Sequence, residues 1–227
     1  MKRKIIVFIP ARGGSKGIPL KNIKKFLGEP LIVHSINYAK DSKKVDKIIL
    51  STDHEEIQKI AEKNNIEVLK RPKSISNDIA TTESAIEHFI YKYNLDKKTI
   101  CVLLQPTSPL RPKNSLDKIL KTFIENKYDS MLTLSPIHPL AWKINNQLIP
   151  MYDYKNRPRR QDFQNEDLIY DENGSVYIFT LDSFFKNNNR LGGKIGYYIF
   201  DEEYGKQIDT PLDFKILETI GKFINEE

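Results

Sequence analysis

Short apolar runs alternate with stretches of helical periodicity along most of this chain. Residues 4–10 and 99–104 are continuous apolar runs rich in β-branched side chains, which is typical of strands buried on both faces of a sheet. Strands that alternate with helices of about 10–13 residues predict a parallel sheet with right-handed crossovers, and therefore an α/β fold. The other expected strands are 47–51, 66–69, 130–134, 175–179 and 196–200, and the expected helices are 30–42, 54–64, 81–93, 115–126 and 211–224.

Two acidic residues are candidates for helix caps. Asp53 is expected to cap the helix 54–64, with Glu56 three residues later as its partner in a capping box. Asp213 is expected to cap or decorate the last helix, because it lies in the first turn.

The regular alternation stops between residues 138 and 174. Prolines at 139, 150 and 158 and a polar run at 155–161 interrupt this segment, and long connections of this kind are usually functional. We therefore expect a single domain, residues 1–227, with an inserted arm at about 138–174 that forms a lid or packs on another subunit.

The positive charge balance narrows the class of partner. Lys and Arg number 36 against 30 Asp and Glu, which gives a net charge of +6 and invites a nucleic-acid interpretation. The lysines are scattered beside acids, however, and the sequence has no Cys/His finger or RNA-recognition aromatic motif, so no nucleic acid is expected as a partner. A small anion such as a nucleoside triphosphate would equally favour a basic cleft.

Cysteine content and apolar run length exclude two further classes of protein. The one Cys, Cys101, lies inside a predicted buried strand, so a disulfide framework is excluded. The longest apolar run, 5–10, is far shorter than the ~20 residues that a membrane span needs. We expect a cytoplasmic protein with no membrane partner.

A glycine-rich loop, residues 10–19, directly follows the first predicted strand. Open parallel sheets bind ligands at this end of the strand. Glycines let a backbone approach an anion closely. Arg12 and Lys16 in the loop, and Lys21 just after it, supply cations for phosphate groups. The spacing matches neither the P-loop nor the dinucleotide-binding motif, so neither of those mechanisms is predicted.

Segments spread over almost the whole chain resemble one enzyme family, the acylneuraminate cytidylyltransferases, or CMP-sialic acid synthetases. The resemblance implies a mostly parallel, Rossmann-like nucleotidyltransferase sheet with a dimerisation arm, and it implies CTP and a divalent metal as ligands. The segments that carry it occur in the family's order and are Ala11–Asn22, Ser51–His54, Leu104–Arg111, Arg157–Asp162, Glu172–Ser175 and Ile208–Thr210.

The resemblance also implies roles for individual residues, and their chemistry suits those roles. Asn and Gln amides offer both a donor and an acceptor to a base or ribose edge, and Arg binds carboxylates and phosphates in a bidentate fork. Arg12, Lys21 and Arg160 are the expected catalytic residues, and Asp209 is the expected carboxylate for Mg²⁺ or Mn²⁺. The expected nucleotide-binding residues are Arg12, Ser15, Lys16, Lys21, Asn22, Arg71, Thr82 and Gln105, and the expected sugar-binding residues are Arg160, Gln161 and Asn173.

The resemblance predicts transfer of CMP from CTP to the anomeric hydroxyl of a nonulosonic acid, a nine-carbon α-keto acid sugar, by a homodimer that releases pyrophosphate. Two departures from the family's pattern leave alternatives open. Asp171 stands where some relatives have Arg, which keeps a legionaminate- or pseudaminate-like acid or 3-deoxy-octulosonate as alternative substrates. Gln207 stands where many relatives have a second metal-binding Asp. This departure keeps open the alternative that the chain is a catalytically silent, nucleotide-binding descendant of the enzyme.

Overall fold

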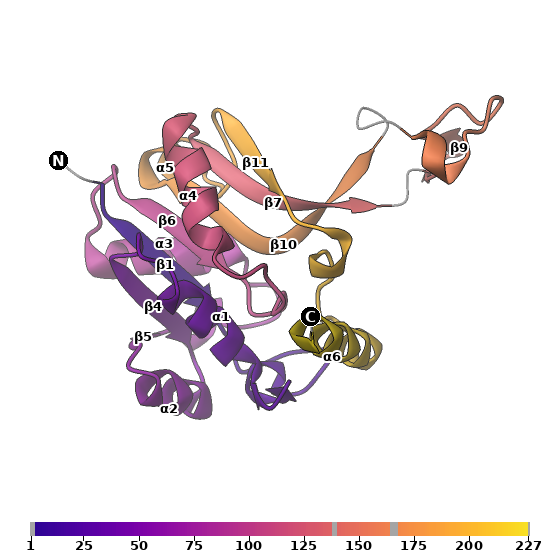
Figure 1. Cartoon of the computed structure of the whole chain (residues 1–227). Coiled ribbons are helices and arrows are strands. Elements are labelled where there is room, and N and C mark those ends of the chain that lie inside the picture. The colour runs from indigo at the N-terminus through magenta and orange to yellow at the C-terminus, as the bar shows by residue number, and fades with distance from the viewer. Residues whose placement is uncertain (1–2, 138–139, 164–167, 227) are drawn as a thin grey trace.

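The computed structural model describes residues 3–137, 140–163 and 168–226. A seven-stranded sheet lies at its centre, with helices on both faces (Figure 1). No helix in these ranges is long and apolar enough to cross a membrane. The strands of the sheet, in spatial order, are Ile195–Ile199 (β11), Ser130–Ile137 (β7), Ile169–Thr180 (β10), Ile100–Leu104 (β6), Ile5–Pro10 (β1), Lys47–Thr52 (β4) and Glu67–Lys70 (β5). The helices are Leu31–Lys40 (α1), Glu55–Lys63 (α2), Thr82–Tyr93 (α3), Ser115–Glu125 (α4), Leu181–Asn187 (α5) and Pro211–Glu226 (α6).

The sheet is parallel except around one strand. β1 pairs in parallel with β4 and β6, β4 with β5, and β7 with β11. β10 runs antiparallel to both of its neighbours, β6 and β7. The predicted α/β fold with a mostly parallel sheet is confirmed.

β1 supplies both halves of the core, because successive side chains of a strand point to opposite faces. Val7 and Ile9 pack against α1, α2 and α4 on one face. Ile6 and Phe8 pack against α3 and α5 on the other face, where the rings of Phe8 and Phe89 stack at 4.7 Å between centroids. The continuous apolar run therefore forms a fully buried strand, and the loop after Pro10 emerges at a rigid sheet edge.

The start of α6 is fixed by a cap. The Asp213 carboxylate accepts hydrogen bonds from the Thr210 hydroxyl at 2.8 Å and the Thr210 N–H at 2.7 Å, which holds the pKa of Asp213 below its usual value. The same carboxylate accepts the N–H of Asp209 at 3.1 Å. Asp213 lies inside the first turn of α6, and the capping hydroxyl is that of Thr210, which accepts the N–H of Asp213 at 3.2 Å. Asp213 is therefore the reciprocal partner of the cap, and these contacts order the segment that carries Asp209.

Asp53 does not cap α2, contrary to the prediction. His54 is the capping residue, and its Nδ1 accepts the N–H of Glu56 at 3.3 Å. The Asp53 carboxylate instead accepts the N–H of Gly13 at 2.9 Å. This contact forms because β1 and β4 are parallel neighbours, so the loops after them emerge side by side.

β10 begins earlier than the sequence predicts, so the arm is shorter than expected. Residues 169–172 pair with residues 134–137 of β7, and a bulge follows between Glu172 and Tyr177. Asn173 and Gly174 therefore lie inside a strand. α5 is not predicted from sequence because it has only seven residues, although Thr180 caps it.

The arm projects away from the sheet at the far end of β7 and β10 (Figure 1). Its described part contains two short antiparallel strands, Trp142–Asn145 (β8) and Gln147–Pro150 (β9), and a 3-10 turn at Arg160–Asp162. Apolar side chains lie exposed on it, and Ile144 is 81% exposed.

Candidate active site

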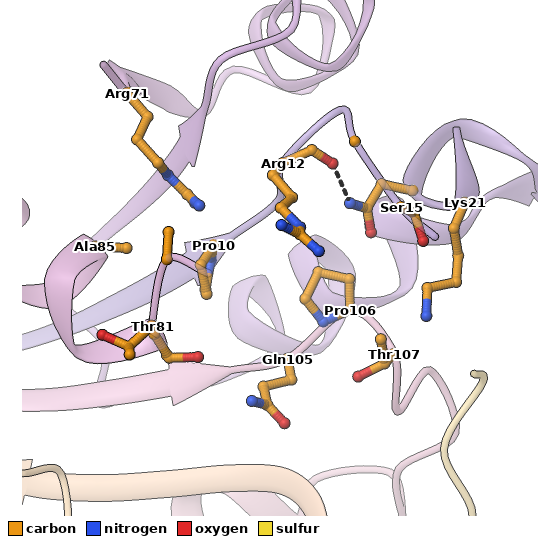
Figure 2. A pocket seen from close by; sticks show the side chains of 14 residues that line it. Pro10, Arg12, Ser15, Lys21, Arg71, Thr81, Ala85, Gln105, Pro106 and Thr107 are labelled. Carbon is orange, nitrogen blue, oxygen red and sulfur yellow. Dashed lines mark hydrogen bonds between the residues drawn. The ribbon is translucent and has the colours of Figure 1, made fainter. Parts of the chain in front are cut away.

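A cavity of about 290 Å³ opens at the carboxyl ends of β1 and β6 (Figure 2). Open parallel sheets bind their ligands at this edge. All predicted nucleotide-binding residues except Lys16 line it. The lining residues are Pro10, Arg12, Gly14, Ser15, Lys21, Asn22, Arg71, Ala80, Thr81, Thr82, Ala85, Gln105, Pro106 and Thr107.

The glycine-rich loop is held in a fixed shape around this cavity. The Asn22 side chain donates a hydrogen bond to the Arg12 carbonyl at 2.9 Å, drawn as a dashed line in Figure 2. A Cβ atom at Gly17 would meet the Asp209 carbonyl oxygen at 2.0 Å, so only glycine allows this approach. Together with the bond from Gly13 to Asp53, these contacts direct Arg12 toward the cavity.

Asp78 faces the two cations of the loop. Its carboxylate lies 3.2 Å from Nη2 of Arg12 and 3.4 Å from Nζ of Lys16. Arg12 also donates to the Asn77 carbonyl at 2.5 Å. Lys16 is exposed and does not line the cavity, so in this conformation it contacts Asp78 instead. A bound phosphate group would compete with Asp78 for both cations.

Arg71 is a buried cation on the wall of the cavity. Its Nε donates to the Ser51 hydroxyl at 3.0 Å, and its Nη2 donates to the Ser51 carbonyl at 2.7 Å. Burial lowers the pKa of Arg71 to about 10, against a smaller opposing effect of Asp53. Arg71 therefore keeps its positive charge at neutral pH and can face an anionic ligand.

Gln105 and Thr82 supply uncharged polar groups to the cavity. Gln105 lines the cavity at the end of β6 (Figure 2), and its amide makes no hydrogen bond to another described residue. Thr81 caps α3 by accepting the N–H of Ser84 at 3.1 Å. Since Thr81 provides the cap, the Thr82 hydroxyl is available to a ligand.

Lys21 connects the cavity to Asp209. Its Nζ donates to the carbonyl of Ile208 and lies 3.5 Å from Oδ1 of Asp209. The Lys21 side chain is nearly buried, whereas the side chain of Asp209 is 74% exposed. Within the described ranges, no three His, Cys, Asp or Glu side chains gather in a group that could hold a metal ion. Any metal at Asp209 would therefore need ligands from substrate or water.

The predicted sugar-binding residues lie outside this cavity. Asn173 is 1% exposed, and its amide accepts from Thr133 at 2.7 Å and donates to Ser135 at 3.0 Å. Arg160 and Gln161 lie in the 3-10 turn of the arm, which projects away from the sheet (Figure 1). None of the arm residues that the structure describes lines this cavity.

Thr107 lines the cavity but was not singled out from the sequence. Its carbonyl accepts the N–H of Ile208 at 2.8 Å, which fastens the loop after β6 to the segment of Asp209. The signal for Thr107 is its place inside Leu104–Arg111, the segment that carries part of the family resemblance.

The fold and the cavity define an α/β protein with a cationic pocket at the carboxyl edge of its sheet. The family profile described as cytidylyltransferase matches residues 6–222. The chain belongs to the cytidylyltransferase family.

Two curated relatives show the extent of the likeness. The N-acylneuraminate cytidylyltransferase of Oncorhynchus mykiss is 36% identical over 224 residues, which cover 96% of this chain and 50% of that protein. The post-translational flagellin modification protein B of Campylobacter coli is 34% identical over 227 residues, covering 96% of this chain and 95% of that protein. The chain spans about half the length of the N-acylneuraminate cytidylyltransferases that it matches.

Solved structures share the fold at low sequence identity. The structure of CMP:2-keto-3-deoxy-manno-octonic acid synthetase complexed with CTP has a TM-score of 0.70 at 16% identity, covering 99% of this chain and 100% of that one. The structure of 4-diphosphocytidyl-2C-methyl-D-erythritol synthase has a TM-score of 0.70 at 11% identity, covering 97% and 99%. These likenesses establish the fold alone.

Proposed function

We propose that this chain transfers CMP from CTP to the anomeric hydroxyl of a sialic-type acid and releases pyrophosphate. The observation that carries the proposal is the cavity at β1 and β6, which gathers the cations Arg12, Lys21 and Arg71 with the amides of Asn22 and Gln105. The choice of acid is supported by the relatives named N-acylneuraminate cytidylyltransferase. The test is pyrophosphate release from CTP with Mg²⁺ in the presence of such an acid.

The reaction asks for little covalent chemistry from the protein. The anomeric oxygen forms a bond to the α-phosphorus while the bond from the α-phosphorus to the bridging oxygen of pyrophosphate breaks, and the hydroxyl proton passes to solvent or to a base that we do not assign. Such transfers depend on positioning and on neutralising phosphate charge. Arg12 and Lys21 would hold the phosphates, and Arg12 would exchange Asp78 for a phosphate oxygen as CTP binds.

The nucleoside would be read by the uncharged groups of the cavity. Gln105 and Asn22 present amides, and Thr82 presents a hydroxyl from the start of α3. Arg71, braced on Ser51, would face the phosphates or the base edge as a fixed cation. Ser15, in the glycine-rich loop, would donate to a phosphate oxygen.

We propose Asp209 as the protein carboxylate for Mg²⁺ or Mn²⁺. The donor set fits, because Mg²⁺ is usually bound by one or two carboxylates together with substrate phosphates and water, and Asp209 is an exposed carboxylate beside the cavity residue Lys21. When bound, the metal supplies charge neutralisation at phosphate oxygens. Lys21 would hold the Asp209 segment in place through its bond to Ile208.

The Asp209→Asn variant tests this assignment. Losing the charge of the carboxylate is expected to raise the Mg²⁺ concentration for half-maximal activity roughly tenfold to a hundredfold, with little change in Tm because Asp209 is exposed. The measurement is activity against Mg²⁺ concentration, with Glu203→Gln, another exposed acid, as the matched control. An unchanged Mg²⁺ requirement in Asp209→Asn would refute the metal assignment.

We also propose a homodimer in which the arm of one subunit covers the cavity of the other. Arg160 and Gln161 can bind the sugar acid only if the arm reaches a cavity, and each arm projects away from its own sheet (Figure 1). The exposed apolar side chains of the arm, among them Ile144 and Leu148, would then be covered. Asn173 would act from beneath the site, by shaping β10. We place the reaction in the cytoplasm, where CTP is available.

A further inference from the structure

Arg111 is a buried cation to which the proposed reaction gives no ligand contact. The residue is 8% exposed and does not line the cavity at β1 and β6. No acid forms a salt bridge with it among the residues that the structure describes, and burial lowers its pKa to about 10. Arg111 is therefore charged at neutral pH, and because burying an unpaired charge is costly, the hydrogen bonds of Nη1 and Nη2 offset part of that cost, while Nε has no partner among the described residues.

Those hydrogen bonds go to the end of β6, to β10 and to helix α1. Nη2 donates to the Gln105 carbonyl at 2.8 Å and to the Ser175 carbonyl at 3.1 Å. Nη1 donates to the Ser35 hydroxyl at 3.1 Å, and the guanidinium lies over the ring of Tyr38 at 5.2 Å. One planar group thus joins the end of β6, the bulge of β10 and helix α1.

The loop between Gln105 and Arg111 makes a turn that is bonded to the same Gln105 carbonyl. The N–H of Ser108 donates to the Gln105 carbonyl at 3.2 Å, and the Ser108 hydroxyl donates to the Asn173 carbonyl at 3.1 Å. The Gln105 carbonyl therefore has two donors, one of them charged. Because this carbonyl is fixed, the backbone position from which the Gln105 side chain extends toward the cavity is fixed as well.

We propose that Arg111 is a positioning residue for nucleobase selection, which acts by holding Gln105 through its backbone carbonyl. This proposal rests on the proposed function, in which Gln105 reads the base of CTP. Arginine suits the role because its planar fork donates in several fixed directions at once, whereas the single ammonium group of lysine does not. Arg111 touches no ligand itself, so its effect should appear as lost discrimination between bases.

The test is the affinity of the full chain for CTP and for UTP, measured by calorimetry without sugar. Arg111→Lys is expected to lower the ratio of the two affinities roughly tenfold, because small displacements of a positioning group have large effects on recognition. In a Gln105→Ala background the same change should have no further effect on the ratio, since residues that act as a unit are not additive. Tyr38→Phe is the matched control, because it removes a buried hydrogen bond to Ser115 at 2.7 Å and leaves the ring under Arg111.

The outcomes separate this inference from the proposed function. Wild-type affinity for CTP with an unchanged CTP/UTP ratio in Arg111→Lys overturns the role of Arg111 and leaves the proposed function intact. Absence of CTP binding by the wild type overturns both. If Arg111→Lys does not fold, the same affinities are measured for Ser35→Ala, which removes the partner of Nη1. The ratio of CTP to UTP affinity is then expected to fall about threefold. An unchanged ratio would overturn the proposal.

Discussion

Exchanging Lys21 for methionine is expected to lower kcat/KM for CTP roughly 10²- to 10³-fold, the usual loss when one preorganised donor to a developing charge is removed. Methionine keeps an unbranched side chain in the nearly buried position but has no ammonium group. The variant loses the proposed phosphate contact and the bond from Nζ to the Ile208 carbonyl, which holds the segment of Asp209. Both losses act on the triphosphate end of the substrate.

The diagnostic measurement is the affinity for CTP and for cytidine in the same variant. CTP should bind much more weakly to Lys21→Met, whereas cytidine should bind as it does to the wild type. Lys25→Met is the matched control, because Lys25 is an exposed residue of the two-residue strand Lys25–Phe26 and the same charge is removed there. Equal losses for CTP and cytidine would contradict a role for Lys21 at the phosphates.

Arg160→Ala is expected to lower kcat/KM for the sugar acid roughly 10²- to 10³-fold, since leaving a buried carboxylate without its partner costs several kcal/mol. The affinity for CTP should stay within about twofold of the wild type, because none of the described arm residues lines the cavity. Steady-state kinetics with each substrate varied in turn separate the two effects. Parallel losses for CTP and sugar would be incompatible with sugar recognition by Arg160.

The same two variants test whether the arm acts across subunits. In an equal mixture of Lys21→Met and Arg160→Ala chains that exchange subunits, each mixed dimer would have one site with an intact cavity and an intact arm. The mixture should then recover about a quarter of the wild-type activity, as random pairing in a two-fold dimer requires. Recovery no greater than the mean of the separate variants would show that the arm does not serve a partner's cavity.

The nucleotide side of the cavity is largely predictable from sequence because its residues lie in short segments directly after buried strands. The glycine-rich loop follows β1, and Gln105 follows β6, which is a parallel neighbour of β1. The carboxyl ends of parallel neighbours meet at one edge, so the apolar runs alone indicate that these segments converge. Lys16 is the exception, because its orientation depends on Asp78, which lies far away along the chain.

The features that the sequence does not reveal depend on long-range pairing. Asn173 lies in an Asn-Gly pair typical of a turn, yet it is buried in β10 because Thr133 and Ser135 on β7 bind its amide. The pairing of β10 with β7 contains a bulge, and no local sequence pattern predicts it. Asp53 likewise has the local signature of a helix cap, but its carboxylate accepts the N–H of Gly13 instead of capping the helix.

The measurement that tests the central proposal most directly is pyrophosphate release from CTP and Mg²⁺ with N-acetylneuraminate, and in parallel with legionaminate, pseudaminate and 3-deoxy-octulosonate. The account predicts release with a nonulosonic acid, absent when CTP or the acid is omitted and lost in Lys21→Met. Release with 3-deoxy-octulosonate alone would contradict the proposed class of acid, but it would still support transfer of CMP from CTP. No release with any of the four acids, in a chain that still binds CTP, would contradict the proposed transfer itself.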